Sequence, residues 1–467
     1  MTSSQDSVTQ APVRHGSVRH DFLLTDLYQL NMMQAYLEAG KTGTAVFEFF
    51  VRKLPEHRQF LMAAGLEQCL DFLETLRATP AELDWLASTG RFSRDFIDYL
   101  ARMRFTGDVL AMPEGTVCFP DEPILRVTAP MPVAQYAETR LLNLLHFGTL
   151  IASKAARMVL AADGRALVDF GLRRAHGAEA GLLAARAAYL AGCTGTATVA
   201  AGRAFGVPIH GTMAHSFVET FDSEAEAFEA FAHARPEGLV LLIDTYDTEA
   251  GARKVVDLAP KLAEAGIEIE GVRLDSGDLE DLAHKVRAIL DAGGLSGVSI
   301  LASGGLDETA IARLVRAGAP IAGFGVGTGL TTSQDAPSLD SAYKLQEYDG
   351  IARRKKSSGK VTWPGRKQVW RCHDAEGVMD GDTLSTEGDR QDGEPLLRPV
   401  MQAGRRVGAQ PTLEASRAHA AAELARLPRH MRRLEPGPDY PVRVADPLRR
   451  LAEEVDRRIE RHQRRER

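Results

Sequence analysis

From residue 165 onward, short apolar runs alternate with segments whose apolar residues recur at helical spacing. The strand-like runs are 166–170, 194–199, 207–211, 239–244, 269–276, 298–303 and 320–328. The helical segments between them are 178–191, 223–234, 248–265, 279–292 and 307–317. A repeat of about 30 residues is typical of βα units, which build parallel sheets. About seven such strands, too many for a small Rossmann unit, predict an irregular TIM-like α/β barrel.

The flanking segments follow another pattern, which predicts a second, mixed α+β domain. Helices are expected at 21–39, 60–76, 92–103, 134–159, 413–427 and 447–467, with strands at 45–52 and within 107–127. The expected parts are a disordered leader 1–20, an N-terminal α+β domain 21–135 joined by about 341–440, an α/β barrel domain 136–340 and a charged C-terminal helix 441–467. The alternating charges of that last helix are typical of a solvated surface helix rather than an RNA-binding tail.

Composition narrows the class of protein. The chain has 467 residues, 44% hydrophobic and 25% charged, enough for a large core and two domains. A net charge of −7 argues against nucleic-acid binding. Four scattered cysteines without CxxC spacing argue against a zinc site or a disulfide framework and favour a reducing cytoplasm. The polar first 20 residues predict no signal peptide, and no apolar run approaches the ~18 residues of a membrane-spanning helix.

Polar residues follow the predicted strands one after another. His215 comes just after the run 207–211, interpreted as a buried strand, and an imidazole is suited to proton or phosphoryl transfer near neutral pH. A single strand-end histidine is more often a packing or capping residue. Because the carboxyl ends of parallel strands meet at one face of a barrel, a whole set of such residues is expected to converge. The set includes Asp169–Arg174, Gly195–Thr198, Thr212, Asp244, Asp247, Arg273, Asp275, Ser303 and Gly323–Gly329.

Two glycine-rich turns predict a phosphorylated ligand. The run ASGGLDET at 302–309 ends a strand and opens a helix, and GFGVGTG at 323–329 lies at the last strand. Such turns let backbone N–H groups approach an anion, and a helix N-terminus adds a favourable dipole. Each alone could be an ordinary tight turn, but the pair on the last two strands favours phosphate binding. The second run is not a Rossmann fingerprint, because no first βαβ unit follows it.

Charged residues near these turns have two interpretations each. Arg173 and Arg273 could bind a carboxylate or phosphate, or could pair with Asp169 and Asp275. Asp244, Asp275 and Asp278 could hold Mg²⁺ beside a diphosphate, or could act as helix N-caps. The sequence alone assigns no metal ligand.

Nine motifs between residues 20 and 371 resemble the nicotinate phosphoribosyltransferase family. They are LLTDLYQLNM (23–32), FFVRKLP (49–55), AAGLEQCL (63–70), DFGLRRAHG (169–177), GTMAHSFV (211–218), LLIDTYDT (241–248), GVRLDSGDL (271–279), ASGGLDE (302–308) and GFGVGTGLTT (323–332). The tail after about residue 372 matches no family pattern. The resemblance implies a cytoplasmic ligase that makes nicotinate mononucleotide from nicotinate and 5-phosphoribosyl 1-diphosphate for NAD biosynthesis. It further implies ATP as co-substrate, Mg²⁺, a phosphohistidine and a homodimer with shared active sites.

The resemblance also implies roles for single residues. His215 resembles the phosphorylated catalytic histidine, with Asp275 as a second catalytic residue, and Tyr28 and Phe170 resemble the aromatic pair around the pyridine ring. Thr212 and Arg273 resemble nicotinate contacts, and Arg173 lies near the base and diphosphate. The 5-phosphate cradle corresponds to Ser303, Gly304, Gly325, Gly327 and Thr328. Where many relatives carry Asn or Asp, this chain has Gly304-Gly305, which leaves backbone contacts only.

Three alternatives stay open beside this hypothesis. Nicotinamide phosphoribosyltransferases are similar but carry an aspartate where this chain has Ala197, and a carboxylate there would repel nicotinate. Quinolinate phosphoribosyltransferases are shorter and use more basic residues. A non-catalytic nucleotide-sensing barrel should have lost at least one of the four residues His215, Tyr28, Phe170 and Arg273.

Overall fold

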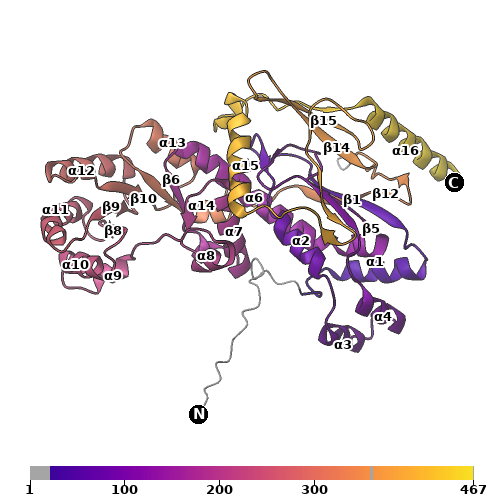
Figure 1. The fold of residues 1–467 in the computed structure, drawn as a ribbon, viewed down its shortest axis with the longest axis horizontal. Helices are drawn as coiled ribbons and strands as arrows, with labels where there is room; N and C mark the ends of the chain where they lie inside the picture. The colour runs from indigo at the N-terminus through magenta and orange to yellow at the C-terminus, as the bar shows by residue number, and fades with distance from the viewer. Residues whose placement is uncertain (1–20, 358–360, 466–467) are drawn as a thin grey trace, which may run out of the picture.

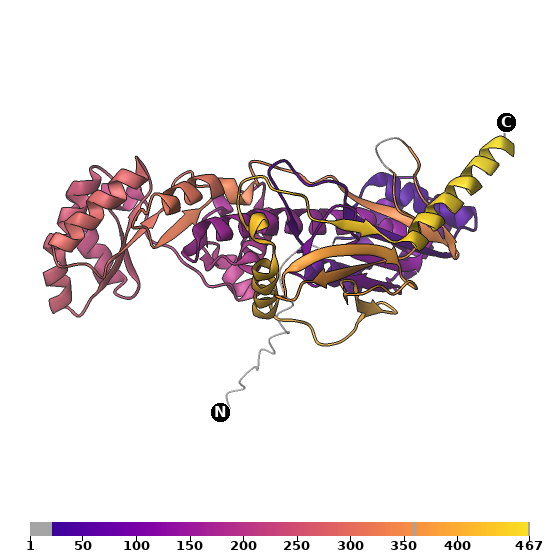
Figure 2. The same cartoon turned by 90° about the horizontal axis from the view of Figure 1, so that it is seen from above.

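The computed structural model describes residues 21–357 and 361–465, so the predicted leader 1–20 lies outside the described residues. The molecule is elongated and has two halves (Figures 1 and 2). A parallel sheet with its helices occupies one half, and mainly antiparallel sheets occupy the other. Helix α15 (Leu413–Arg426) lies between them in Figure 1.

In the part of the chain that the structure describes, six parallel strands form the first sheet, in the order β7-β6-β11-β10-β9-β8. They are β6 (Ala166–Asp169), β7 (Gly195–Thr196), β8 (Leu239–Leu242), β9 (Ile269–Leu274), β10 (Ser299–Ala302) and β11 (Gly323–Val326). The connecting helices include α7 (Ala178–Ala191), α8 (Val199–Phe205), α10 (Glu224–Ala234), α11 (Thr248–Glu264), α12 (Leu279–Ala292) and α13 (Glu308–Arg316). The sheet is therefore an open half-barrel built from βα units.

The predicted buried strand at 207–211 is wrong. Val207 is buried, but Ile209 is 55% exposed, and the segment makes a single bridge, between Ile209 and Thr196. Pro208 lacks an N–H for a ladder, which restricts it to a sheet edge. His215 consequently does not follow a strand. It is the first residue of the short helix α9 (His215–Glu219).

The second half is built on a sheet that mixes early and late segments. Among the described residues its order is β13-β12-β1-β5-β3-β17-β18, with antiparallel neighbours. These strands are β1 (Thr44–Val51), β3 (Asp108–Ala111), β5 (Leu125–Pro130), β12 (Ser341–Tyr348), β13 (Ile351–Ala352), β17 (Arg398–Gln402) and β18 (Arg405–Arg406). The N-terminal segment and the chain beyond residue 340 thus share one sheet. The exact domain boundaries stay a prediction.

Smaller elements surround this sheet. The strands β2 (Leu61–Met62) and β4 (Val117–Cys118) pair with each other, and β14 (Lys367–His373), β15 (Met379–Thr386), β16 (Glu394–Pro395) and β19 (Val442–Val444) form a further sheet. The helices are α1 (Leu27–Glu38), α2 (Leu66–Thr75), α3 (Pro80–Ser88), α4 (Arg94–Arg102) and α5 (Met131–Tyr136). The single helix expected at 60–76 is wrong: it is β2 followed by α2. Gly65, at φ +96°, divides them, because a Cβ there would lie 2.6 Å from the Leu144 carbonyl oxygen.

Helix α6 (Glu138–Ala162) connects the two halves. It is the one helix of the described residues that is long and apolar enough to cross a membrane, and 78% of that apolar window is buried inside the protein. Its buried Lys154 and Arg157 contact Glu308 of α13 at 2.5 and 3.2 Å. These features are those of a core helix of a folded protein. All four cysteines are free.

The C-terminal segments join both halves. Arg417 of α15 donates to the carbonyls of Tyr189, Gly192 and Cys193, at the end of α7. On the other side of α15, Glu423 accepts from the Arg371 guanidinium at 2.8 Å. Helix α16 (Asp446–Arg465) packs through Leu448, Ala452 and Val455 and leaves its charged face exposed. That arrangement agrees with the predicted surface helix.

Candidate active site

A cavity of about 220 Å³ lies at the carboxyl ends of β6, β9, β10 and β11. Phe170, Arg173 and Asp275 form part of its wall. The predicted cradle residues also line it: Ser303, Gly304, Gly325, Gly327 and Thr328. The structure therefore brings eight predicted site residues to one place, as expected for strand ends in a parallel sheet.

Two glycines give this cavity its shape. A Cβ at Gly325 would lie 2.4 Å from Cε2 of Phe170, so the ring packs directly on the strand backbone. Gly304 has φ +94°, and a Cβ there would lie 1.9 Å from the carbonyl oxygen of Asp275. No side chain fits at position 304 in this arrangement. Only backbone contacts are offered at that position.

The amino end of a helix and further polar residues complete the wall of the cradle. Helix α13 begins at the cavity, with the side chain of Asp307 capping the backbone N–H of Ala310 at 2.8 Å. Its amino end directs a favourable dipole towards the cavity. Arg174, a member of the set expected to converge there, and Gln334 also line the cavity, although neither was assigned a role. Arg174 is adjacent to the predicted Arg173, whereas no sequence signal pointed to Gln334.

His215 lies beside Asp275, a residue of the cavity wall. His215 Nδ1 lies 3.2 Å from the Thr245 hydroxyl, and its Nε2 lies 3.9 Å from Asp275 Oδ2. Ser303 in turn donates its hydroxyl proton to Asp275 Oδ1 at 2.5 Å. The imidazole is thus held at the edge of the cavity, half exposed, with Nε2 facing the carboxylate. Thr245 was missed at the sequence level, although it lies inside the motif LLIDTYDT.

A second carboxylate, Asp244, lies behind Asp275. Its Oδ2 accepts from the Asp275 backbone N–H at 2.9 Å and from the Ser276 hydroxyl at 2.7 Å. Its Oδ1 is buried and has no hydrogen-bond partner among the described residues. One or two carboxylates plus phosphate oxygens are the usual Mg²⁺ ligands, so this pair fits that ion. In residues 21–357 and 361–465, no group of three or more His, Cys, Asp or Glu side chains is placed to hold a metal ion.

Arg273 and Thr212 meet at the same carbonyl. Arg273 donates to the Met213 oxygen at 3.0 Å, and the Thr212 hydroxyl donates to it at 3.5 Å. Burial lowers the pKa of the Arg273 guanidinium, while the nearby charges of Asp275 and Asp244 raise it. Its Nε is buried without a partner among the described residues, so one donor of the fork is still available.

Two aspartates considered as ligands or ion-pair partners have structural roles. Asp278 caps α12 by accepting from the backbone of Glu280 and Asp281. Asp169 accepts from the Thr196 hydroxyl at 2.7 Å and from the Gly171 N–H at 2.8 Å. Burial raises the pKa of the Asp169 carboxyl. Both oxygens of Asp169 are therefore engaged: Oδ2 joins β6 to β7, and Oδ1 fixes the turn that follows β6.

Tyr28 does not line the cavity. It lies on α1, in the half of the molecule opposite the parallel sheet (Figure 1), and its side chain is 46% exposed. Its hydroxyl donates to Glu138 Oε2 at 3.3 Å. The predicted residues His215, Thr212 and Arg273 lie beside the cavity without lining it. Tyr28 is the one predicted site residue that the fold of a single chain places in the other half of the molecule.

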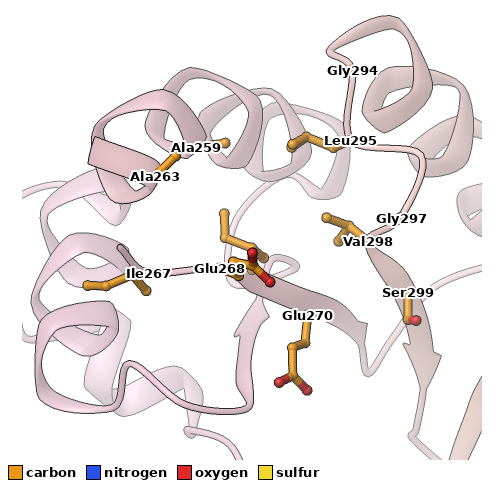
Figure 3. Close-up of a pocket in the computed structure, with 11 residues that line it drawn as sticks. Ala259, Ala263, Ile267, Glu268, Glu270, Gly294, Leu295, Gly297, Val298 and Ser299 are labelled. Atoms are coloured by element: carbon orange, nitrogen blue, oxygen red, sulfur yellow. The ribbon is translucent and has the colours of Figure 1, made fainter. Parts of the chain in front are cut away.

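A larger cavity, about 570 Å³, lies at the opposite, amino-terminal ends of β9 and β10 (Figure 3). Its walls are mainly small and aliphatic residues, with Glu268 and Glu270 as the charged groups. No predicted site residue reaches it. Ligands of open α/β sheets bind beyond the carboxyl ends of the strands, so the smaller cavity is the better candidate.

Comparisons with known proteins agree with this geometry. Three family models match successive parts of the chain: the nicotinate phosphoribosyltransferase N-terminal domain at 23–146, the nicotinate phosphoribosyltransferase family at 165–353, and the C-terminal domain at 389–452. The chain belongs to the nicotinate phosphoribosyltransferase family. The third match corrects the sequence interpretation, in which the tail after residue 372 matched no family.

Individual relatives support the family assignment. The nicotinate phosphoribosyltransferase pncB2 of Mycobacterium tuberculosis is 52% identical over 426 residues, covering 91% of both chains. A nicotinate phosphoribosyltransferase of Bacillus subtilis is 38% identical and covers 80% of this chain and 78% of its own. The crystal structure of human nicotinic acid phosphoribosyltransferase superposes with a TM-score of 0.84 at 32% identity, covering 93% of this chain and all of that one. The expected mixed α/β fold class is thereby confirmed.

Proposed function

We propose that the chain catalyses ATP-coupled synthesis of nicotinate mononucleotide from nicotinate and 5-phosphoribosyl 1-diphosphate. Family membership and the relatives support nicotinate phosphoribosyltransferase activity in NAD biosynthesis. The observation that carries the finer proposal is the cavity itself. An aromatic ring, two arginines, a carboxylate and a glycine cradle meet there, at strand ends.

The base is assigned to the Phe170 side of the cavity. Stacking on the ring holds a flat heterocycle through its face, and Arg273 supplies a fixed cation for the nicotinate carboxylate. Ala197, in the turn after β7, adds no acidic group that would repel this carboxylate. This pattern supports nicotinate over nicotinamide.

The phosphoribosyl substrate is assigned to the glycine cradle. The base nitrogen would form a bond to ribose C1 while the bond from C1 to diphosphate breaks and its electron pair leaves with the diphosphate. Arg173 and Arg174 would offset the charge of that leaving group. Asp244 and Asp275 would hold Mg²⁺, which supplies further charge neutralisation when bound. Ser303 would keep the Asp275 carboxylate turned towards the cavity.

His215 is assigned as the phosphoryl carrier. With Nδ1–H donated to Thr245, Nε2 carries the lone pair and faces the cavity. Attack of Nε2 on the γ-phosphorus of ATP would form an N–P bond, break the P–O bond to ADP and release ADP with that electron pair. Later hydrolysis of the N–P bond would release phosphate and restore the neutral imidazole.

The active site is proposed to be shared within a homodimer. Among the exposed large apolar residues that the structure describes, Trp85, Ile351 and Val361 stand apart, and the others form two groups. Leu24, Leu27 and Tyr28 lie at or near α1, while Leu172, Val199, Ile209 and Tyr246 lie in loops and short helices after the parallel strands. An isologous dimer would place the first group of one chain over the second group of the other. Tyr28 of each chain would then cover the base site of its partner.

One experiment tests the activity directly. Turnover is measured with nicotinate or nicotinamide, each with and without ATP. We expect nicotinate with ATP to give much the highest kcat/KM. Comparable kcat/KM for the two bases would favour the nicotinamide enzyme, and binding without turnover would favour the nucleotide-sensing protein. A cytoplasmic location stays an expectation from the cysteine pattern.

A further inference from the structure

The carboxylate of Glu138, at the first residue of α6, gathers donors from three other elements. Glu138 is only 7% exposed, although it is an ionisable residue. Its Oε2 accepts from Gln135 Nε2 at 2.7 Å, from Gln29 Nε2 at 3.0 Å and from the Tyr28 hydroxyl at 3.3 Å. Lys344 of β12 lies 3.4 Å from Oε1. A buried carboxylate needs such donors to offset its loss of hydration.

This network is the main polar attachment of α1. The side chain of its N-cap residue, Asp26, accepts no hydrogen bond from the first backbone N–H groups of the helix. Asp26 instead accepts from the Thr139 hydroxyl at 2.9 Å, beside Glu138. Gln135 of α5 donates to both Gln29 and Glu138. The start of α1 is therefore attached through polar side chains to the start of α6.

Tyr28 differs from the other donors because it is close to half exposed. Packing within its own chain leaves much of the ring free, so the hydroxyl contact with Glu138 has a large share in fixing the ring direction. Burial, together with the charge of Glu138, raises the pKa of Tyr28 to about 12. The hydroxyl thus keeps its proton at neutral pH and stays a donor to the carboxylate.

We propose that Glu138 is a positioning residue for base binding: it holds Tyr28 so that the ring is presented to the base site of the partner chain. The proposal rests on the shared site argued above. Glu138 itself does not line the cavity and touches no substrate. Its effect is preorganisation, which lowers the cost of ordering the ring when nicotinate binds.

The test is a double-mutant cycle on the full-length homodimer. KM for nicotinate and kcat are measured for Glu138→Gln, Tyr28→Phe and the double variant. Each single change is expected to raise KM roughly tenfold and alter kcat by less than about twofold, because the ring is present but less often in place. Glu138→Gln weakens the acceptor and Tyr28→Phe removes the donor of the same contact, so the double variant should match Tyr28→Phe. Additive effects, or an unchanged KM in Tyr28→Phe, would overturn the proposal.

A matched control removes a different polar attachment of α1. Gln34→Ala deletes the side chain that accepts from the Ser93 backbone N–H at 3.0 Å and leaves the Tyr28–Glu138 contact in place. We expect a modest loss of thermal stability with an unchanged KM for nicotinate. A KM increase equal to that of Glu138→Gln would show that loosening α1 in general is enough, and the specific role of Glu138 would then be wrong.

Subunit mixing separates this proposal from the shared site itself. In the first mixture, inactive Tyr28→Ala chains are combined with inactive His215→Ala chains. In the second, Glu138→Gln chains are combined with His215→Ala chains. Activity is measured at nicotinate concentrations below KM. One site of each hybrid dimer then combines an intact barrel with an intact Tyr28–Glu138 pair. Recovery in both mixtures is expected. No recovery in the first, despite verified subunit exchange, contradicts the shared site. Recovery in the first alone contradicts the role of Glu138.

Discussion

The edge of the parallel sheet and helix α1 hold their candidate residues in different ways. At the sheet edge, backbone geometry places them, because strands β6, β9, β10 and β11 end at the same cavity. Glycines at 304 and 325 let the chain and the Phe170 ring approach each other closely. On α1, a side-chain network around Glu138 places Tyr28, which lies away from that cavity.

This difference shows which part of the candidate active site a single chain can complete. A site built from strand ends is complete as soon as the sheet forms, since topology alone brings its members together. A site that borrows a residue from another element needs that element to be held, and by our proposal it also needs a second copy of the chain. We expect changes at the sheet edge to affect the chemistry, and changes around α1 to affect base binding.

The largest effect is expected for His215→Ala. Removing the nucleophile should abolish ATP hydrolysis coupled to turnover and leave slow phosphoribosyl transfer without ATP, because the contacts to base and ribose remain. Incubation with γ-labelled ATP should give an acid-labile, base-stable label on the unchanged protein and none on the variant. A label that persists on His215→Ala, or that never forms on the unchanged protein, contradicts the assignment.

Arg273→Met is expected to have the next largest effect. Loss of a desolvated, charge-assisted pair costs about 2–5 kcal/mol, which corresponds to roughly 30- to several thousand-fold in kcat/KM for nicotinate. The same change should affect nicotinamide much less, because the amide carries no charge. Steady-state kinetics with both bases check this selectivity. Equal losses for the two bases would show that Arg273 supports the fold of the loop at Met213 rather than the carboxylate.

Gly325→Ala tests the close approach of backbone and ring at the sheet edge. The new Cβ would lie 2.4 Å from Phe170, so the ring must move, and a displacement of about 1 Å is enough to lower kcat/KM roughly 100-fold. Gly297→Ala is the matched control, since no atom lies within 4 Å of a Cβ there. Kinetics and thermal melts of both variants make the comparison. Full activity in Gly325→Ala would place the base away from Phe170.

The sequence was most informative where burial dominates. The strands β8, β9, β10 and β11 lie inside the predicted runs, because fully buried parallel strands are continuously apolar. The interpretation failed at 207–211, where Pro208 and an exposed Ile209 mark an edge segment. It also failed at Gly65, because the nearby Leu144 carbonyl belongs to a distant helix.

Prediction of the site residues has the same limit: contacts between residues distant in sequence are not visible in a local pattern. Motifs at strand ends were predicted together, since their meeting follows from the topology of the sheet. Thr245 and Gln334 were missed because their roles depend on contacts with His215 and the cavity, which are distant in sequence. The position of Tyr28 follows from packing of α1 against α5, from its polar contacts with the start of α6 and, by our proposal, from a second chain. No pattern within α1 encodes either partner.

The smallest effect on activity is expected at the contact between the two halves of the molecule. Glu114, just after β3, is buried and accepts from Arg186 of α7 at 2.9 and 2.6 Å and from the backbone of Gly65 and Leu66. Burial raises the pKa of the Glu114 carboxyl, but the charge and hydrogen bonds of Arg186, with the backbone donors, outweigh it and lower that pKa below its ordinary value.

A carboxyl whose pKa is lower in the folded state stabilises the fold above its ordinary pKa, and that stability is lost as pH falls through the folded pKa. Thermal stability should therefore decline below about pH 4.5, the ordinary range of a glutamate. In Glu114→Gln the overall stability should be lower, because Arg186 loses its partner, yet its decline as the pH falls below about 4.5 should be smaller. Calorimetric melts across that pH range measure both quantities. An identical pH dependence in the two proteins would show that other carboxylates control the acid sensitivity of the junction.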